Sequence, residues 1–173
     1  MSVVGVDLGI RRVAIVAPAE RRYAELALRI HHLDRLHELA QIAAFVSHFA
    51  RGCGKPTHLF IEEAYLSNGP KLNQTTTVGM AEVVATVMTA CAWDSATKVS
   101  NSHWKEQLTG NGHLDKPEIA RWLLHEDRAL FDLVGNSQDM VDAACIGIYG
   151  QGIQTGRYVP SVPRRKPYRA RPT

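Results

Sequence analysis

The strongest constraint on the fold is a pair of short apolar runs that each end in acidic residues. Residues 2–6 form the first run and lead into Asp7-Leu8-Gly9, and residues 58–61 form the second and lead into Glu62-Glu63. Both runs have the length and composition of buried strands. Because ligand sites in open α/β sheets gather at the carboxyl ends of strands, we expect Asp7 and Glu62 to face one cleft.

Further periodic patterns complete the expected order of elements. Two strand-like runs at residues 12–17 and 23–30 flank a Pro-Ala-Glu turn, and residues 96–100 predict one more strand. Apolar residues at helical spacing predict four helices, over residues 33–49, 76–91, 116–125 and 138–149. The prediction is an α/β fold with a mixed five-stranded sheet, three antiparallel strands and then two more, flanked by helices.

Two further acids share a face of the last predicted helix. Asp139 and Asp142 are three residues apart, which places them roughly 60° apart around the helix axis, and their flanks are apolar. Carboxylates that converge at a buried edge raise one another's pKa unless cations bind between them. Mg²⁺ and Mn²⁺ prefer oxygen ligands of this kind. We therefore expect a metal site of Asp7, Glu62, Asp139 and Asp142; Glu63 could replace Glu62, but strand alternation points only one of the two inward.

The net charge of +3 is unevenly distributed along the chain. Residues 1–156 carry 14 basic and 17 acidic side chains, whereas residues 157–173 carry six basic side chains, no acidic one and four prolines. Prolines oppose helices and central strands, so this segment is predicted to be a flexible basic tail. It would neutralise DNA phosphates without sequence preference or, alternatively, only aid solubility. Its candidate DNA-binding residues are Arg164, Arg165, Lys166, Arg169 and Arg171.

Length and composition exclude several classes of protein. A chain of 173 residues suits one domain. No apolar stretch approaches about 18 residues, and the N-terminus lacks the basic segment of a signal peptide, so neither a membrane span nor secretion is expected. Three scattered cysteines do not form a disulfide framework or a zinc knuckle. These features predict a reduced, cytoplasmic protein.

Four stretches follow one another in a distinctive order: GVDLG at residues 5–9, IEEAYL at 61–66, HWKEQLTGNGHLDK at 103–116 and SQDMVDA at 137–143. In order and spacing, across about residues 3–150, they resemble RuvC-type Holliday-junction resolvases of the ribonuclease H-like superfamily, phage members included. The resemblance implies a ribonuclease H-like nuclease domain over residues 1–156. It also implies a metal-dependent endonuclease that resolves four-way junctions or other branched DNA by paired phosphodiester hydrolysis, in a bacterial cell or a phage-infected host.

The resemblance assigns roles to the four acids. Two Mg²⁺ ions, for which Mn²⁺ substitutes, would activate a water and stabilise the leaving oxygen. Asp7 would bridge the ions, Glu62 and Asp142 would each complete the shell of one ion, and Asp139 would be an additional ligand or a proton carrier.

The resemblance also implies DNA contacts and a symmetric assembly. Lys105 and Lys116 match family lysines that contact DNA beside the site. Tyr65 matches an aromatic residue that stacks on bases at the junction centre. The following loop adds three further candidates for DNA contact, Lys71, Asn73 and Gln74. A homodimer that faces a two-fold junction is implied, with the apolar helix over residues 76–91 at its interface.

Three alternatives are open at this point. A ribonuclease H-like nuclease could act on RNA or on an RNA–DNA hybrid, and substrate choice would distinguish it. A non-catalytic module that binds branched DNA is opposed by the complete acidic set. An actin-like ATPase or sugar kinase also opens with a strand, D-x-G and a hairpin, but its two domains and second phosphate loop need a longer chain.

Overall fold

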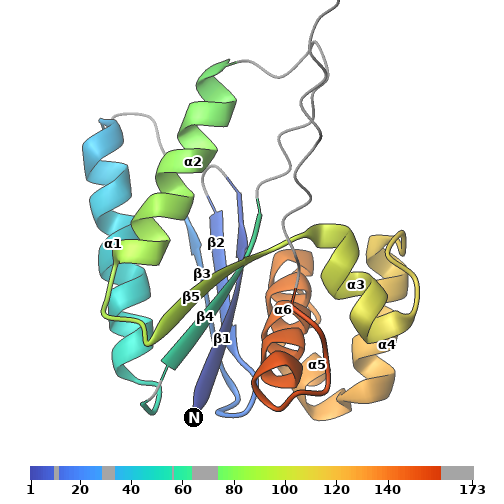
Figure 1. Ribbon diagram of the computed structural model, residues 1–173. Helices are drawn as coiled ribbons and strands as arrows, with labels where there is room; N and C mark the ends of the chain where they lie inside the picture. Colours follow the sequence, from blue (N-terminus) through green and yellow to red (C-terminus); the bar gives the residue numbers. More distant parts are fainter. Residues whose placement is uncertain (10–11, 29–33, 56, 64–73, 161–173) are drawn as a thin grey trace, which may run out of the picture.

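A mixed five-stranded sheet forms the centre of the computed structural model, which describes residues 1–9, 12–28, 34–55, 57–63 and 74–160 (Figure 1). The strands lie in the order β3-β2-β1-β4-β5. Pairing is antiparallel for β1 with β2 and β2 with β3, and parallel for β1 with β4 and β4 with β5. The mixed sheet predicted from the sequence is therefore confirmed. Its strands are β1 (Ser2–Leu8), β2 (Arg12–Ala17), β3 (Arg22–Ala27), β4 (Thr57–Glu62) and β5 (Ser95–Val99).

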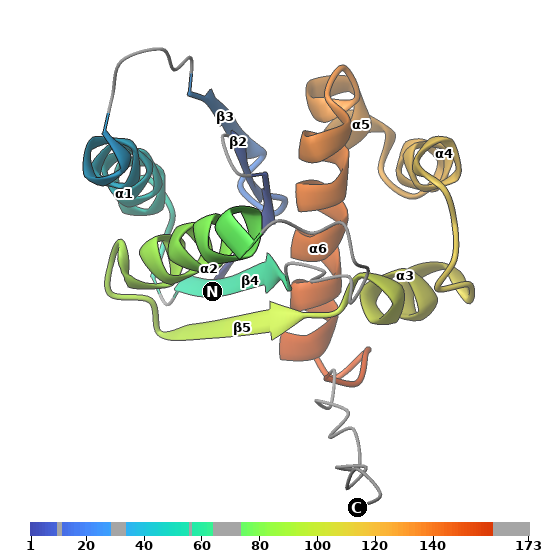
Figure 2. The same ribbon diagram turned by 90° about the horizontal axis from the view of Figure 1, so that it is seen from above.

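Helices cover both faces of this sheet (Figure 2). One face carries α1 (Arg35–Arg51) and α2 (Gln74–Thr89). On the other face α6 (Gln138–Gln154) packs against the sheet, and α3 (Asn101–Thr109), α4 (Lys116–Glu126) and α5 (Arg128–Val134) pack against α6. The two faces hold separate apolar cores, since side chains alternate along each strand: Val3 packs on the α6 side, and Val4 and Val6 pack on the α1 side.

Two helices in the described structure, α3 and α5, are absent from the sequence prediction. They have nine and seven residues, and isolated helices of that length are marginal in water. Each is held by buried side chains: Trp104 anchors α3, and Leu130 and Val134 anchor α5. Tertiary packing, which no local periodicity reports, therefore stabilises both. The structure also ends β3 at Ala27 and continues α6 to Gln154.

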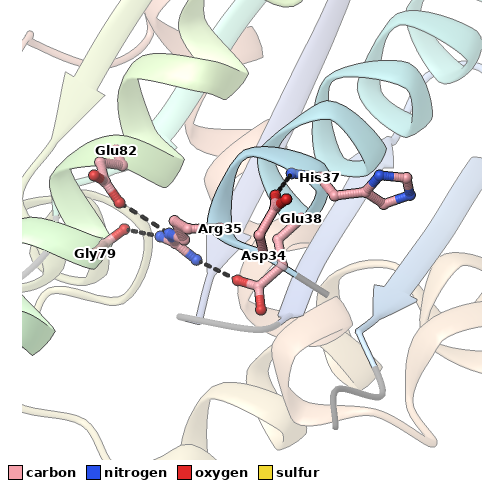
Figure 3. Close-up of polar contacts among 6 residues, drawn as sticks. All are labelled: Asp34, Arg35, His37, Glu38, Gly79 and Glu82. Carbon is pink, nitrogen blue, oxygen red and sulfur yellow. Dashed lines mark hydrogen bonds and ion pairs between the residues drawn. The ribbon is translucent and has the colours of Figure 1, made fainter. Parts of the chain in front are cut away.

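An arginine joins the two helices on the α1 face (Figure 3). Arg35, the first residue of α1, donates to Glu38 at 2.8 Å on its own helix. It also donates to Glu82 at 2.9 Å and to the carbonyl of Gly79 at 2.6 Å, both on α2. These contacts fix the first half of α2 beside α1. The opposite side of α2 faces outward and exposes Ala81 and Ala85. This side of the helix is therefore uncovered in the single chain, although these side chains are apolar.

Strand β1 and helix α6 approach each other more closely than side chains normally permit. A Cβ atom on Gly5 of β1 would collide with the backbone of Ala143 and Gly147 on α6. The two glycines thus let α6 cross directly over β1. This packing brings the first turns of α6 to the end of β1 that carries Asp7.

Replacing Gly5 with alanine is expected to destabilise the protein by about 1–3 kcal/mol, the usual range for overpacking a core, because backbone atoms of α6 cannot move aside as a side chain would. Urea unfolding measures the change. Gly54→Ala is the matched control, because a Cβ there meets no atom within 4 Å among the described residues. Equal stability of the two variants would contradict the close approach.

No helix in the part of the chain that the structure describes is long and apolar enough to cross a membrane.

Candidate active site

Asp7 lies at the carboxyl end of β1, on the face that packs against α6. Its side chain follows Val3 and Gly5 on that face by strand alternation, and it is only partly exposed. The pKa of Asp7 is raised from 3.8 to about 8, chiefly by burial and additionally by the negative charges of Glu62, Asp142 and Asp139. A hydrogen bond from the Leu8 backbone opposes the shift. The pKa of Asp7 is therefore raised by all three of the other predicted acids.

Glu62 ends the neighbouring strand β4 and points to the same side of the sheet. It follows Phe60, which lies in the α6-side core, whereas Ile61 lies in the core on the α1 side. One carboxylate oxygen accepts from Asn101 Nδ2 at 2.7 Å, and the other accepts from Trp104 Nε1 at 3.1 Å. Glu63 is exposed and borders a cavity with Val84 and Lys98, on the α2 side. The two glutamates thus face opposite ways, as alternation predicts.

Asp139 and Asp142 project from the first turns of α6. Ser137 precedes this helix and caps it, since its hydroxyl accepts from the backbone N–H of Met140 at 3.4 Å. Asp142 accepts from Gln138 Nε2 at 2.9 Å. Burial raises the pKa of Asp142 to about 6; Glu62 adds to this shift, and the Gln138 bond opposes it. Asp139 is 28% exposed and pairs with Arg12 of β2 at 3.7 Å.

Two lysines from the resembling stretch lie on the same side of the molecule. The positive charges of Lys116 and Lys105 partly offset the rise in the pKa of Asp142, so both amines act on this carboxylate. Lys105 Nζ donates to the carbonyl of Leu114 at 3.1 Å and lies 5.5 Å from the centre of the Trp104 ring. Lys116 is exposed at the start of α4. The structure thereby brings both predicted lysines to the acidic cluster.

The chemistry of the four acids suits a hard cation. Their oxygens are the ligands that Mg²⁺ prefers, and the negative charges of the other three acids contribute to the raised pKa of Asp7. Within the described residues, however, no three His, Cys, Asp or Glu side chains stand close enough to hold a metal ion. Three of the acids instead contact protein groups: Glu62 with Asn101 and Trp104, Asp139 with Arg12, and Asp142 with Gln138. The donor set fits Mg²⁺, and Asp139 and Asp142 would leave Arg12 and Gln138 to bind it.

Sequence reasoning did not identify the residues that contact the acids: Arg12, Asn101, Trp104 and Gln138. Trp104 stands inside the HWKEQ stretch and Gln138 directly precedes Asp139, so both lie in segments already singled out. Nothing in the local pattern, however, shows that Asn101 and Trp104 reach Glu62, about 40 positions earlier in the chain.

The predicted DNA-binding residues Tyr65, Lys71 and Asn73 lie outside the described residues. So do the predicted tail residues Arg164, Arg165, Lys166, Arg169 and Arg171. The start of the tail contacts the body. Tyr158 stacks on Tyr149 of α6 with 6.0 Å between ring centres, and the carbonyl of Val159 accepts from the Tyr149 hydroxyl at 3.1 Å.

Comparison with solved structures shows what the chain resembles. The structure of RuvC from Thermus thermophilus aligns with a TM-score of 0.64 and 16% identity, over 93% of this chain and all of that one. T. thermophilus RuvC in complex with a Holliday junction substrate aligns with a TM-score of 0.67 and 14% identity, over 93% of this chain and 99% of that one. No protein-family profile and no curated protein sequence matches. The chain therefore has a ribonuclease H-like fold and is similar in structure to T. thermophilus RuvC over nearly its whole length.

Proposed function

We propose that this protein is a metal-dependent endonuclease that resolves Holliday junctions or related branched DNA by paired phosphodiester hydrolysis. The observation that carries the proposal is that Asp7 and Glu62 end neighbouring parallel strands of a RuvC-like sheet, under the helix α6 that carries Asp139 and Asp142. The other three acids all raise the pKa of Asp7. The structurally similar T. thermophilus protein has been seen with a Holliday junction substrate.

The four acids would hold two Mg²⁺ ions, with Mn²⁺ as a substitute. Asp7, which lies under the influence of the other three, would bridge the ions, and Glu62 and Asp142 would each complete one shell. Asp139 is partly exposed and paired with Arg12 at a long 3.7 Å, which suits an additional ligand or a group that accepts a proton from water. Bound Mg²⁺ would supply Lewis acidity that activates a water and offsets charge on the reacting phosphate.

The lysines would act on the DNA rather than on the water. Lys116 is exposed, and the charges of Lys105 and Lys116 reach Asp142. An ammonium group whose charge reaches the acids would also hold a phosphate next to the site and stabilise the negative charge that develops on it. Lys105, tied to the Leu114 carbonyl, has a fixed position from which to do so.

We further propose a homodimer in which two such sites face a two-fold junction. The outward side of α2 supports this assembly, because it exposes small and apolar side chains: Val78 is 57% exposed, and Ala81 and Ala85 are exposed beside it. Tyr65 would then stack on bases at the centre of the junction, and Lys71 and Asn73 would contact the DNA.

The basic tail, residues 157–173, would add DNA affinity without sequence preference. Replacing its five distal cations (Arg164, Arg165, Lys166, Arg169 and Arg171) with glutamine is expected to weaken binding to every DNA substrate alike. The slope of log affinity against log salt should fall by about 0.9 for each duplex phosphate that the tail no longer neutralises. Fluorescence anisotropy between low and physiological salt measures both. An unchanged slope of log affinity against log salt would show that the tail takes no part in DNA binding.

One cleavage assay tests the proposed function. Purified protein is incubated with end-labelled four-way junction, linear duplex, Y-fork and RNA–DNA hybrid, each with Mg²⁺, Mn²⁺ or chelator. Paired, symmetric, metal-dependent nicks in the junction are the expected result. Cleavage of the hybrid alone would replace the proposal with a ribonuclease, and binding without cleavage under any metal would replace it with a non-catalytic module.

A further inference from the structure

We infer that Asn101 and Trp104 are positioning residues for Glu62, which they orient for cation binding through one hydrogen bond to each carboxylate oxygen. The inference rests on the proposed function and adds residues to it. Asn101 Nδ2 donates to Oε1 at 2.7 Å, and Trp104 Nε1 donates to Oε2 at 3.1 Å. With each oxygen held separately, the carboxylate plane cannot rotate freely.

The sheet register brings these donors to Glu62. Strands β4 and β5 are parallel, and Glu62 lies opposite Val99. The backbone N–H of Glu63 donates to the carbonyl of Val99 at 2.7 Å, which fastens the two strand ends together. Helix α3 begins two residues after Val99, at Asn101. Trp104 follows three residues later, so both side chains leave the same face of the first turn.

Helix α3 is anchored on the rest of the domain. Trp104 has no exposed surface and belongs to the same core as Met140 and Val141 of α6. Two other residues of α3 contact Val159: His103 Nε2 lies 2.9 Å from its carbonyl oxygen, and Gln107 accepts from its backbone N–H at 3.2 Å. Donors built on a supported element hold a carboxylate more accurately than donors on a loop.

The chemistry of the two donors suits this task. An indole N–H only donates, and the Asn101 contact uses the amide nitrogen, so neither contact competes for a cation. Both groups are neutral, so Glu62 keeps its full negative charge, whereas a lysine partner would cancel it. A carboxylate has about four lone-pair sites, and two hydrogen bonds leave others for a metal. Groups that hold metal ligands in this way contribute typically 10–100-fold to metal affinity.

The simpler explanation is that Glu62 only satisfies a buried indole N–H, as buried tryptophans require. That explanation needs no second donor, yet Asn101 donates at the shorter distance, 2.7 Å. It also predicts no effect on metal binding. Metal affinity, measured without DNA, therefore separates the two explanations.

The test compares Trp104→Phe and Asn101→Leu in the full chain. Each substitution keeps the approximate shape of the side chain and removes the donor. Trp93→Phe is the matched control, because it loses an indole hydrogen bond of the same 3.1 Å length to the backbone carbonyl of Val87, away from the acids. Calorimetry with Mn²⁺ alone and urea unfolding are measured on all four proteins. Asn101→Leu keeps the test decisive if Trp104→Phe unfolds, because Asn101 lies at the partly exposed start of α3.

Both test variants are expected to bind Mn²⁺ about tenfold more weakly than the unsubstituted protein and Trp93→Phe. In cleavage, the Mg²⁺ concentration for half-maximal rate should rise by a similar factor, while the rate at saturating Mg²⁺ stays close to that of the unsubstituted enzyme. A spectroscopic signature accompanies these changes: of the indole N–H resonances of the three tryptophans, Mn²⁺ should broaden that of Trp104 more strongly than that of Trp93.

Unchanged Mn²⁺ affinity in both variants would overturn the inference while leaving the proposed function intact. Weaker affinity that appears equally in Trp93→Phe would assign the effect to general destabilisation and would also overturn it. Failure of the unsubstituted protein to bind Mn²⁺ or cleave any DNA would remove the proposed function, and the inference with it.

Discussion

Replacing Asp7 with asparagine is expected to abolish metal-dependent cleavage while leaving junction binding intact. Asp7 is the acid whose pKa is raised by all three others, and in the proposed mechanism it touches both ions. Loss of a bridging ligand should remove several kcal/mol of transition-state stabilisation, a rate loss of roughly a thousandfold or more. DNA binding should persist or strengthen, because the substitution removes a negative charge that repels phosphate.

Quantitative cleavage of a labelled four-way junction, together with gel-shift measurements in chelator, checks both parts of this prediction. Glu63→Gln serves as the control, because Glu63 is another acid at the end of a central strand but is exposed on the opposite side of the sheet. The control should cleave at the unsubstituted rate. Cleavage by Asp7→Asn at that rate would show that the metal assignment is wrong.

The second large effect concerns the stability of the metal-free protein, which should fall as the pH rises from about 4 to about 8. Burial and three neighbouring acids raise the pKa of Asp7 from 3.8 to about 8, so the folded state holds a proton that the unfolded state releases. Stability contributed by a raised carboxyl pKa is fully present below the unfolded value and is lost up to the folded value. The slope from this group is at most about 1.4 kcal/mol per pH unit.

Asp142 adds to the loss in the lower part of this range, because its pKa is raised to about 6. Urea unfolding in chelator at several pH values measures the slope. Asp7→Asn should flatten the slope above about pH 6 and make the metal-free protein more stable at pH 8, by an amount on the order of a few kcal/mol. Adding Mg²⁺ should stabilise the unsubstituted protein and not the variant.

Asp132→Asn controls for the loss of any acidic side chain, because Asp132 is 63% exposed and its pair with Arg128 is long, at 3.9 Å. Its pH slope should match that of the unsubstituted protein. If Asp7→Asn also keeps that slope, the pH dependence of stability does not arise from the raised pKa of Asp7.

Stability and activity are thus opposed at this site. The acids that would bind cations are also the groups whose mutual repulsion destabilises the metal-free fold. Neutralising one of them strengthens the protein and removes its proposed chemistry, a trade-off that active sites commonly show.

The strands and acids of this protein could be read from local patterns, because those patterns report on burial within a few residues. The apolar runs before Asp7 and Glu62 predicted two buried strands, and the structure pairs β1 and β4 in parallel so that both acids emerge at one edge. Period-two alternation also predicted that Glu62 and Glu63 face opposite ways, because side-chain direction along a strand depends on nothing outside the strand.

Other features required the tertiary structure. Helices α3 and α5 are too short to be stable by themselves, so their existence depends on the core that Trp104, Leu130 and Val134 enter. The crossing of α6 over β1 depends on two glycines that lie far apart in the sequence, Gly5 and Gly147.

The sequence by itself determined which residues carry negative charge, which strands end in them and how the sheet is composed. Only the tertiary structure decided the burial, the neighbours and the hydrogen-bond partners of those charges. The pKa of Asp7 depends on burial and on acids from β4 and α6, and the orientation of Glu62 depends on donors that the β4–β5 register brings from α3. Electrostatic interactions and hydrogen bonds act through space, so the partners of a charged group follow from packing and not from its neighbours in the chain.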